Sequence, residues 1–586
     1  MVELRSNFPV DSVRGLTRRA EWRALGIDPS ELTKPKVAIV NSSSDLAACF
    51  AHLDDIVPVL KRALREAGCL PFEVRTTVSS DFITSIGRGG RYILPTRDLM
   101  ADDIEVAVEG AQLDAMICLS SCDKTTPAHL MAAGRLNIPT IVIPCGYQHS
   151  GLAADGTYDV EDVFLHSSFH AFSGGDQAAM EAMADTAIRG PGVCAGLATA
   201  NSMHIVAEAL GMALPGSAPV RANSARMWDN VRASARALAE LIERDIRPRD
   251  VITRESIANA IRVILSVGGS INTIKHLQAT AIEAGVDMDV WGAYRELARE
   301  TPLLASVRPN GAALTEEFED AGGAATVIRE LLPLLHGDRI TASGRTVAEN
   351  AALARPADGA VIRPYDDPIT RIPSIVVVRG SLCESAVVKR PIPDPGPYRF
   401  RGPARVFHSR EEGVEAIAAG KVTEGDVPII RGIGLVGGPG MGMTSAFIFA
   451  LEGAGLAGKV AFVTDGQLSG LVNTGIVVGE VSPEAALGGP LGLVQDGDLI
   501  DIDLETGTVD LLVDPDVLAA RPAFVPVDQV ETNGVLAQYR ATVQPLACGA
   551  VLCPRPSAHA CDARDAAAQD AAAGSAATRD AAAGTR

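Results

Sequence analysis

The stretch that decides the fold is AMICLSSCDKTTPAHLMAAGRLNIPTIVIP, residues 115–144. An apolar run at residues 115–119 ends in a polar turn, and a helical pattern with Pro127 in its first turn follows. Proline is accepted at the start of a helix. A second apolar run at residues 140–144 closes the unit. The order strand, helix, strand predicts a layered α/β domain with crossover connections.

The same alternation extends over roughly the first 370 residues. KVAIV at residues 36–40 predicts another strand. A long amphipathic helix is predicted further on, because apolar side chains recur at the spacing of one half-buried face. These are Val231, Ala235, Leu238, Leu241 and Ile242. We therefore expect an α/β domain over residues 1–370.

The pattern changes after a segment rich in Pro and Asp at about residues 364–395. Beyond it, VPIIRGIGLV, KVAFVTDG and the hairpin-like LIDIDLETGTVDLLV are strand patterns bounded by turn residues. We expect a β-rich, barrel-like domain over residues 371–547. From about Asp562 the chain repeats DAAA-type units without large apolar residues, so residues 548–586 are predicted to be a disordered tail.

Composition and charge exclude several classes of protein. The 586 residues are 47% hydrophobic and 21% charged, as in folded globular proteins. The formal net charge of −20 repels phosphate backbones and anionic membrane surfaces. We see no apolar run of signal-peptide or transmembrane length. These features predict a cytoplasmic protein that binds neither nucleic acid nor membranes.

Three of the ten cysteines lie in turns where chemistry is common. Cys122 follows the strand at residues 115–119, and strand ends in α/β sheets are where ligand sites form. An inert buried cysteine beside a surface Asp–Lys pair fits that position equally well. Cys49 and Cys194 lie in two other turns, with no C-x-x-C spacing. Three thiolates that converge would suit an iron–sulfur cluster with an open iron position, which acts as a Lewis acid.

Five longer strings resemble a known family. CDKTTPAHLMAAGRLNIPT, GVCAGLATANSMHIVAEALGMALPGSA, GGSINTIKHLQATA, GGPGMGM and TDGQLSG are similar to signature segments of the dihydroxy-acid dehydratase and sugar-acid dehydratase family, which includes the 6-phosphogluconate dehydratases. The similarity runs in order from about Val37 to about Leu504. It implies a hydro-lyase that forms dimers or tetramers. In that family, the cysteines that match Cys49, Cys122 and Cys194 hold a [2Fe–2S] or [4Fe–4S] cluster.

The resemblance also implies a metal site and a base. Mg²⁺ would be held by Asp81, Asp123 and a carbamylated Lys124, and Ser469 of TDGQLSG would act as an alkoxide base. Each role makes chemical sense. A hard cation assists removal of a proton next to a carboxylate. A serine needs an activator to become a base, and a lysine beside Mg²⁺ must lose its positive charge.

The sequence departs from the family pattern around this site. The family has a Glu shortly after GGPGM, whereas this chain has Gly442 and Met443. Glu452 nearby is interpreted as a helix-surface residue. Three further segments differ: GSLCES at residues 380–385, DFITSIG at residues 81–87, and Ala48-Cys49-Phe50. These changes predict an altered substrate site or Mg²⁺ shell.

Other cysteines and histidines receive structural interpretations. Buried apolar filler is expected for Cys69, Cys118, Cys145 and Cys383. Zinc binding is disfavoured for the irregularly spaced C-terminal group Cys548, Cys553, His559 and Cys561. Ordinary buried or surface roles are expected for His166, His170 and His204.

The sequence thus predicts an Mg²⁺-dependent iron–sulfur hydro-lyase that converts a 2,3-dihydroxy carboxylic acid, first of all one like 2,3-dihydroxyisovalerate, to a 2-keto acid. One alternative is a dehydratase of aldonic acids or of a specialised pathway. Another is a catalytically impaired relative that serves as a binding protein. The small-molecule acid is the only partner expected besides further copies of the chain.

Overall fold

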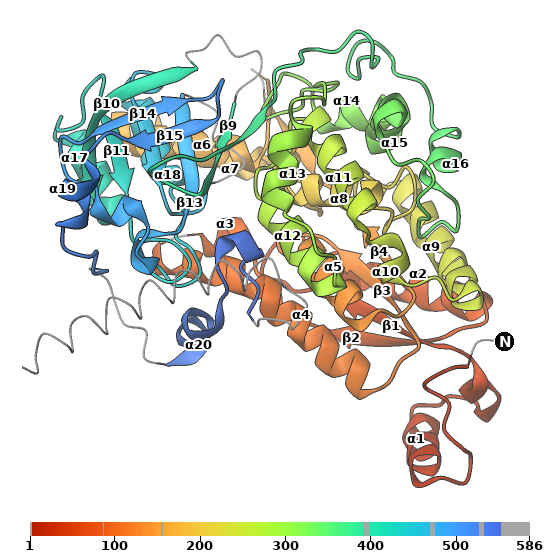
Figure 1. Cartoon of the computed structure of the whole chain (residues 1–586). Coiled ribbons are helices and arrows are strands. Elements are labelled where there is room, and N and C mark those ends of the chain that lie inside the picture. The colour runs from red at the N-terminus through yellow and green to blue at the C-terminus, as the bar shows by residue number, and fades with distance from the viewer. Residues whose placement is uncertain are drawn as a thin grey trace, which may run out of the picture.

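The computed structural model describes residues 3–85, 87–153, 156–390, 398–468, 475–526 and 533–552. An α/β body and a β-rich body lie side by side (Figure 1). Ser469 and most of the predicted tail lie outside the described residues. Among the described helices, none combines the length and apolar character needed to cross a bilayer.

A four-stranded parallel sheet forms the base of the α/β body. Its order is β2-β1-β3-β4. The strands are β1 (Lys36–Asn41), β2 (Leu70–Arg75), β3 (Ala115–Ser120) and β4 (Thr140–Pro144). The strands predicted from the sequence at residues 36–40, 115–119 and 140–144 are therefore confirmed. Each is buried along its length, as expected for a parallel sheet covered on both faces.

Helices cover both faces of this sheet. One face is covered by α2 (Leu53–Glu66) and α9 (Ala225–Arg244), and the other by α4 (Ile93–Gly110) and α5 (Thr125–Leu136). Alternate residues of a strand point to opposite faces. Accordingly, Val37 and Ile39 of β1 pack with α2 and α9, whereas Ala38 and Val40 pack with α4 and α5. The amphipathic helix predicted from Val231 and its partners is α9.

A further layer of helices packs on α5. It consists of α8 (Thr199–Ala209), α11 (Arg254–Ser266), α12 (Thr273–Ala284), α13 (Val290–Leu297) and α15 (Gly323–Glu330). Two of these helices, α8 and α12, contact α5 directly. Thr199 at the start of α8 and Asn272 just before α12 line the same cavity as Cys122, which precedes α5.

The β-rich body contains one eight-stranded sheet, in the order β15-β14-β10-β11-β12-β13-β9-β8. Its strands are β8 (Ile375–Val378), β9 (Ser385–Lys389), β10 (Arg399–Phe407), β11 (Val427–Ile430), β12 (Ala461–Thr464), β13 (Ile476–Ser482), β14 (Leu499–Asp503) and β15 (Thr508–Leu511). The four central strands are parallel, and the flanking pairs are antiparallel. A single bridge between Arg379 and Thr508 joins the two edges. The sheet is thus a nearly closed barrel, which confirms the predicted barrel-like, β-rich region, and β14 with β15 is the predicted hairpin.

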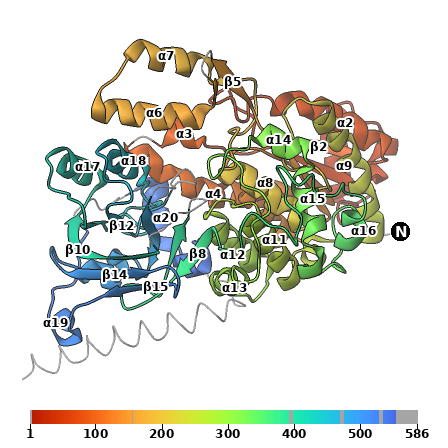
Figure 2. The same ribbon diagram turned by 90° about the horizontal axis from the view of Figure 1, so that it is seen from above.

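Several contacts hold the bodies together, among them one between two helices and one made by the end of the chain. Helix α6 (Val160–Ser173) packs on α18 (Ser445–Gly453), where the rings of Phe164 and Phe449 meet edge to face at 5.4 Å (Figure 2). After the barrel, the chain returns to the α/β body, and α20 (Gly534–Thr542) packs on α4. Arg97 of α4 donates a hydrogen bond to the carbonyl of Ala550 at 2.8 Å. The domain limits at 370/371 and 547/548 stay predictions.

The contact between α5 and α12 yields a stability prediction. A Cβ at Gly134 would lie 2.9 Å from the backbone nitrogen of Ala284, closer than real Cβ contacts allow. Gly134→Ala should therefore lower the free energy of unfolding by about 1–3 kcal/mol through overpacking, although alanine favours a helix. Gly110→Ala in α4 meets nothing within 4 Å and should be neutral or stabilising by up to about 1 kcal/mol. Urea titrations of both variants test this, and equal effects would contradict it.

Candidate active site

The predicted site residues come from loops at one edge of the parallel sheet. Cys49 follows β1, Asp81 follows β2 at the start of α3 (Asp81–Thr84), and Cys122 lies between β3 and α5. The carboxyl ends of parallel strands meet at the same edge, so these three loops are neighbours. Cys194 reaches the same place from the segment just before α8.

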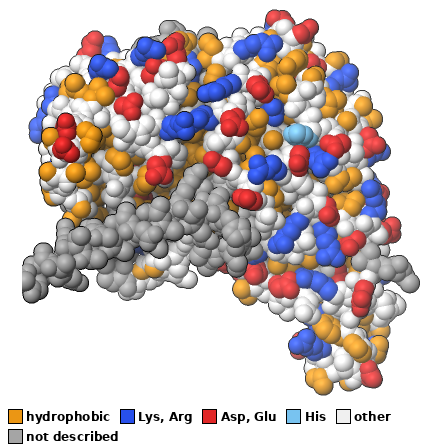
Figure 3. Space-filling view, viewed as in Figure 1, with side chains coloured by type: hydrophobic (Ala, Val, Ile, Leu, Met, Phe, Trp, Pro, Cys, Tyr) orange, Lys and Arg blue, Asp and Glu red, His pale blue; other side chains and the backbone are white. Residues whose placement is uncertain are grey.

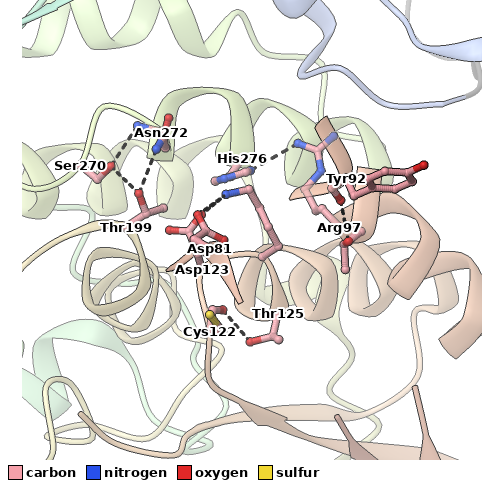
Figure 4. A network of polar contacts seen from close by, with 12 residues as sticks. Asp81, Tyr92, Arg97, Cys122, Asp123, Thr125, Thr199, Ser270, Asn272 and His276 are labelled. Carbon is pink, nitrogen blue, oxygen red and sulfur yellow. Dashed lines mark hydrogen bonds and ion pairs between the residues drawn. The ribbon is translucent and has the colours of Figure 1, made fainter. Parts of the chain in front are cut away.

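These side chains line one cavity of about 660 Å³. Its walls include five predicted residues, namely Cys49, Asp81, Cys122, Asp123 and Cys194. Lys124 is buried directly beside two of them. The structure thus brings together the cysteines and the acidic residues that the sequence singled out, and Figure 4 shows Asp81 and Asp123 close above Cys122. Their ligand roles stay predictions.

The turn that carries Cys122 is held by its own polar groups. The backbone N–H of Ser121 donates to Thr125 Oγ1 at 2.8 Å, and that hydroxyl donates to the Cys122 carbonyl at 2.8 Å. The Ser121 hydroxyl donates to the carbonyl of Cys49. These bonds satisfy polar backbone groups of the turn that precedes α5. They also fix the loops of two cysteines relative to each other.

Cys49 and Cys122 are buried and Cys194 is partly buried, in surroundings where a thiolate needs a cationic partner. A hydrogen bond with Cys49 and burial raise the pKa of Cys122 well above its usual value. Burial, followed by the negative charge of Glu161, raises the pKa of Cys194 well above its usual value. A bound metal would reverse this, because a coordinating thiol is deprotonated. The set of three soft donors around one cavity fits an iron–sulfur cluster.

Lys124 joins the two acidic residues. Its ammonium is almost fully buried, forms an ion pair with Asp123, and lies 3.6 Å from Asp81 Oδ2. Asp81 Oδ1 is buried and has no hydrogen-bond partner among the described residues. Two carboxylates with a spare oxygen suit a hard cation. A carbamate on Lys124 would place anionic oxygen atoms, which can bind a cation, at the position of the ammonium.

The described residues form no group of three or more His, Cys, Asp or Glu side chains able to hold one metal ion. Asp81 and Asp123 alone would hold Mg²⁺ through two carboxylates, which is common for that ion. Cysteines of a cluster need not surround one point, because they bind different irons. The residues present therefore fit both groups.

The barrel supplies the opposite wall of the cavity. Met443 and Gln467 line it, and the Gln467 N–H donates to the Gly442 carbonyl at 2.8 Å. Met443 thus lies on the wall where the resemblance implies a Glu. Gly442 has little room for a side chain, since a Cβ there would lie 3.2 Å from Ile433 Cβ. The described loop ends at Leu468, next to Ser469, which lies outside the described residues.

Sequence reasoning did not identify Glu161 as a site residue. Asp159 caps α6 and accepts hydrogen bonds from the Glu161 and Asp162 N–H groups, which places Glu161 in the first turn. Its buried carboxyl lines the cavity, and its Oε1 has no partner in the described part of the chain. Burial and the charge of Asp159 raise the pKa of Glu161 well above its usual value. The only sequence signal was a capping pattern, DVED, which says nothing about the cavity.

Asn272 is a second residue that the motifs did not single out. It lines the cavity and donates to Thr199 Oγ1 at 2.9 Å, and Thr199 is 2.8 Å from Ser270 Oγ (Figure 4). Lys275 Nζ donates to Asn272 Oδ1 at 2.5 Å. The amide orientation of Asn272 is therefore fixed on both sides.

Lys275 also reaches across to the barrel. Its Nζ lies 2.5 Å from Glu480 Oε1 of β13, and both side chains are fully buried. Glu480 has a positive φ of 57°, and its Oε2 lacks a partner among the described residues. Burial lowers the pKa of Lys275 to about 8, although the charge of Glu480 opposes this. The pair thus links the two bodies immediately behind the cavity wall.

Comparisons with known proteins agree with this architecture. Residues 34–350 match the family described as Dihydroxy-acid/6-phosphogluconate dehydratase N-terminal, and residues 360–550 match the corresponding C-terminal family. A protein named Dihydroxy-acid dehydratase from Methanothrix thermoacetophila is 39% identical over 94% of this chain and 100% of its own length. Proteins of the same name from Ignicoccus hospitalis (89% of this chain, 95% of the relative) and Caldicellulosiruptor saccharolyticus (94% and 100%) are 38% identical.

These matches define the class of protein as a dehydratase, that is, a carbon–oxygen hydro-lyase. The chain belongs to the dihydroxy-acid/6-phosphogluconate dehydratase family. The resemblance inferred from the five sequence strings is confirmed.

The Lys275–Glu480 pair gives a stability prediction. Lys275→Met leaves a buried, unpaired carboxylate and should lower the free energy of unfolding by about 3–5 kcal/mol. Lys275→Met combined with Glu480→Met removes both charges and should recover most of that loss. The matched control is Lys61→Met, whose partner Glu73 lies 3.1 Å away in a partly exposed pair and should cost at most about 1 kcal/mol. Urea titrations measure all three, and a double variant no more stable than Lys275→Met alone would contradict the coupling.

Proposed function

We propose that the protein removes water from a 2,3-dihydroxy carboxylic acid and forms a 2-keto acid. The observation that carries this proposal is the single cavity where three cysteines and two aspartates of the α/β body face a wall from the barrel. A binding protein would need none of these groups in one place. Membership of a dehydratase family supports the same reaction.

Two groups would complete the site. Cys49, Cys122 and Cys194 would hold an iron–sulfur cluster, and Asp81, Asp123 and a carbamylated Lys124 would hold Mg²⁺. When bound, they supply Lewis acidity toward the hydroxyl that leaves and toward the oxygens beside the carbon that loses a proton. The hydrogen bonds of Thr125 hold the turn that carries Cys122 and Asp123 in one conformation without a bound ligand.

The proposed reaction needs one base on the barrel side. Ser469, as an alkoxide, takes the proton from C2 of the substrate. The electron pair of that C–H bond forms the C2–C3 double bond, and the C3–O bond breaks, so that the hydroxyl leaves and is protonated to water. The resulting enol tautomerises to the 2-keto acid. Gln467 lines the cavity two residues before Ser469, which supports this assignment of the base.

The cavity wall favours a substrate with an alkyl group. Phe82, Ile83, Phe164, Val193 and Val414 all line it. Such a surface suits a branched carbon skeleton better than the hydroxyl-rich chain of an aldonic acid, whose hydroxyls would lose water contacts without partners. The first choice is therefore a substrate like 2,3-dihydroxyisovalerate, in keeping with the names of the relatives. The proposal includes a cytoplasmic homodimer or homotetramer.

A matched pair of cysteine variants tests the cluster site. Cys122→Ala should remove most of the bound iron and sulfide and abolish keto-acid formation. Cys118→Ala, four residues earlier on β3 and buried away from the cavity, should keep both. The measurements are iron and sulfide analysis after anaerobic purification and a keto-acid assay on 2,3-dihydroxyisovalerate and a panel of aldonic acids with added Mg²⁺. Full iron content in Cys122→Ala would sink the cysteine assignment.

Replacement of the base separates chemistry from cofactor binding. Ser469→Ala should lower kcat by at least about 100-fold, because general base catalysis contributes factors of that order. The iron content and the visible absorption of the cluster should stay unchanged. A variant that keeps wild-type turnover would show that another group removes the C2 proton.

A further inference from the structure

A second hollow lies on the α/β body, apart from the active-site cavity. Its volume is about 590 Å³, and it lies between α9, the start of α15, and the segment around α16 (Val347–Ala351). These three elements lie together on the side of the molecule away from the barrel in both ribbon views (Figures 1 and 2). None of its lining residues lines the active-site cavity. The hollow, called the arginine groove here, is therefore a separate site.

One face of α9 forms a wall of the groove. Arg226, Asn230, Ala233, Ala237 and Glu240 line it at successive intervals of four, three, four and three residues, which is one helix face. The opposite face of α9 packs on the sheet. The two alanines in the middle leave space, and longer polar side chains stand at both ends.

Positive charge dominates the lining. Arg226, Arg236, Arg345 and Arg355 all line the groove, whereas Glu240 is the only acidic side chain among its described lining residues. Arg226 is paired with Glu319 at 3.6 Å, whereas Arg236 and Arg345 are in none of the ion pairs among the described residues. Elsewhere the chain is strongly acidic, with a formal net charge of −20. In the view of Figure 3, acidic and basic side chains are interspersed, so a concave site with four arginines is unusual for this surface.

Other donors point to an anion as well. The Nδ2 of Asn230 is buried and has no hydrogen-bond partner in the described residues. Helix α15 starts at the groove, where Gly322, Ala325 and Thr326 line it, and no side chain caps this end. The Ala324 N–H in this first turn donates to the Ala218 carbonyl at 2.9 Å, so it is the helix dipole that favours an anion there. Guanidinium groups prefer phosphate and carboxylate because they donate in pairs.

The lining of the groove also has apolar members. Leu214, Pro215 and Leu353 line it together with the two alanines of α9, and Leu353 is 71% exposed. An exposed leucine at the mouth of a charged hollow offers a contact for a flat apolar group. The volume lies within the range of sites that hold whole small molecules. A ligand with phosphates at one end and an apolar ring at the other matches this arrangement.

We propose that the arginine groove binds an organic phosphate of the size of a nucleoside diphosphate, with its phosphates on Arg236 and Arg345 and its ring on the Leu353 side. This inference does not depend on the proposed dehydratase reaction.

The test is calorimetric titration of the full-length holoenzyme with ADP, with Mg²⁺ in excess so that chelation does not disturb the active site. Saturable binding is expected, and Arg236→Ala with Arg345→Ala should weaken it at least about tenfold, because hydrogen bonds between charged partners are strong. Arg232→Ala is the control, since Arg232 lies on the same helix but pairs with Asp229 at 3.0 Å outside the groove. The double variant should keep wild-type turnover.

Three outcomes would overturn the proposal. ADP gives no saturable heat, adenosine binds as tightly as ADP, or the double arginine variant binds ADP like the wild type. A fourth contrary outcome concerns assembly: if the double variant changes the sedimentation coefficient from that of an oligomer to that of a monomer, the groove is an interface between copies of the chain. Pyrophosphate that binds in a manner abolished by the double variant would support the phosphate contacts.

Discussion

The ion pairs of Lys124 with Asp123 and Asp81 are the interaction on which the active-site cavity depends. A buried ammonium between two carboxylates holds together the loops after β2 and β3, and removing the charge of Lys124 would leave both carboxylates without a cationic partner. The neighbouring turn is held by hydrogen bonds to Thr125 and Cys49. The protein therefore carries a compact set of charged and thiol side chains at the carboxyl edge of the sheet.

The barrel completes the site from the other side. Its contribution is not a single loop, because Met443 and Gln467 come from two segments that are bridged to each other. The packing of α6 on α18 and the pair of Lys275 with Glu480 connect the bodies at two points beside the cavity. Movement of one body against the other would therefore alter the cavity, and the buried charges oppose such movement.

Much of the fold could be predicted because it is encoded locally. The strand from Lys36 is a continuous apolar run, and α9 follows a helical period that shows its buried face directly. The β14–β15 hairpin shows its turn in ETGT. The closure of the barrel could not be predicted in this way, since Arg379 and Thr508 are far apart in sequence. The parallel pairing of the four central strands also depends on contacts between distant segments, which local sequence patterns do not show.

The same distinction applies to the site. The cysteines, Asp123 and Lys124 stand in recognisable strings, so sequence reasoning could find them, although their ligand roles rest on the resemblance. Glu161 and the Lys275–Glu480 pair have no such signal. A charged residue in an apolar segment does not show which residue it pairs with when that residue is 205 positions away.

Closure of the barrel has one more consequence. Just after β8, the Arg379 N–H donates to the Gly507 carbonyl and the Val509 N–H donates to the Arg379 carbonyl. Part of the β15 edge is thus already paired, which shortens the edge that a neighbouring chain could join.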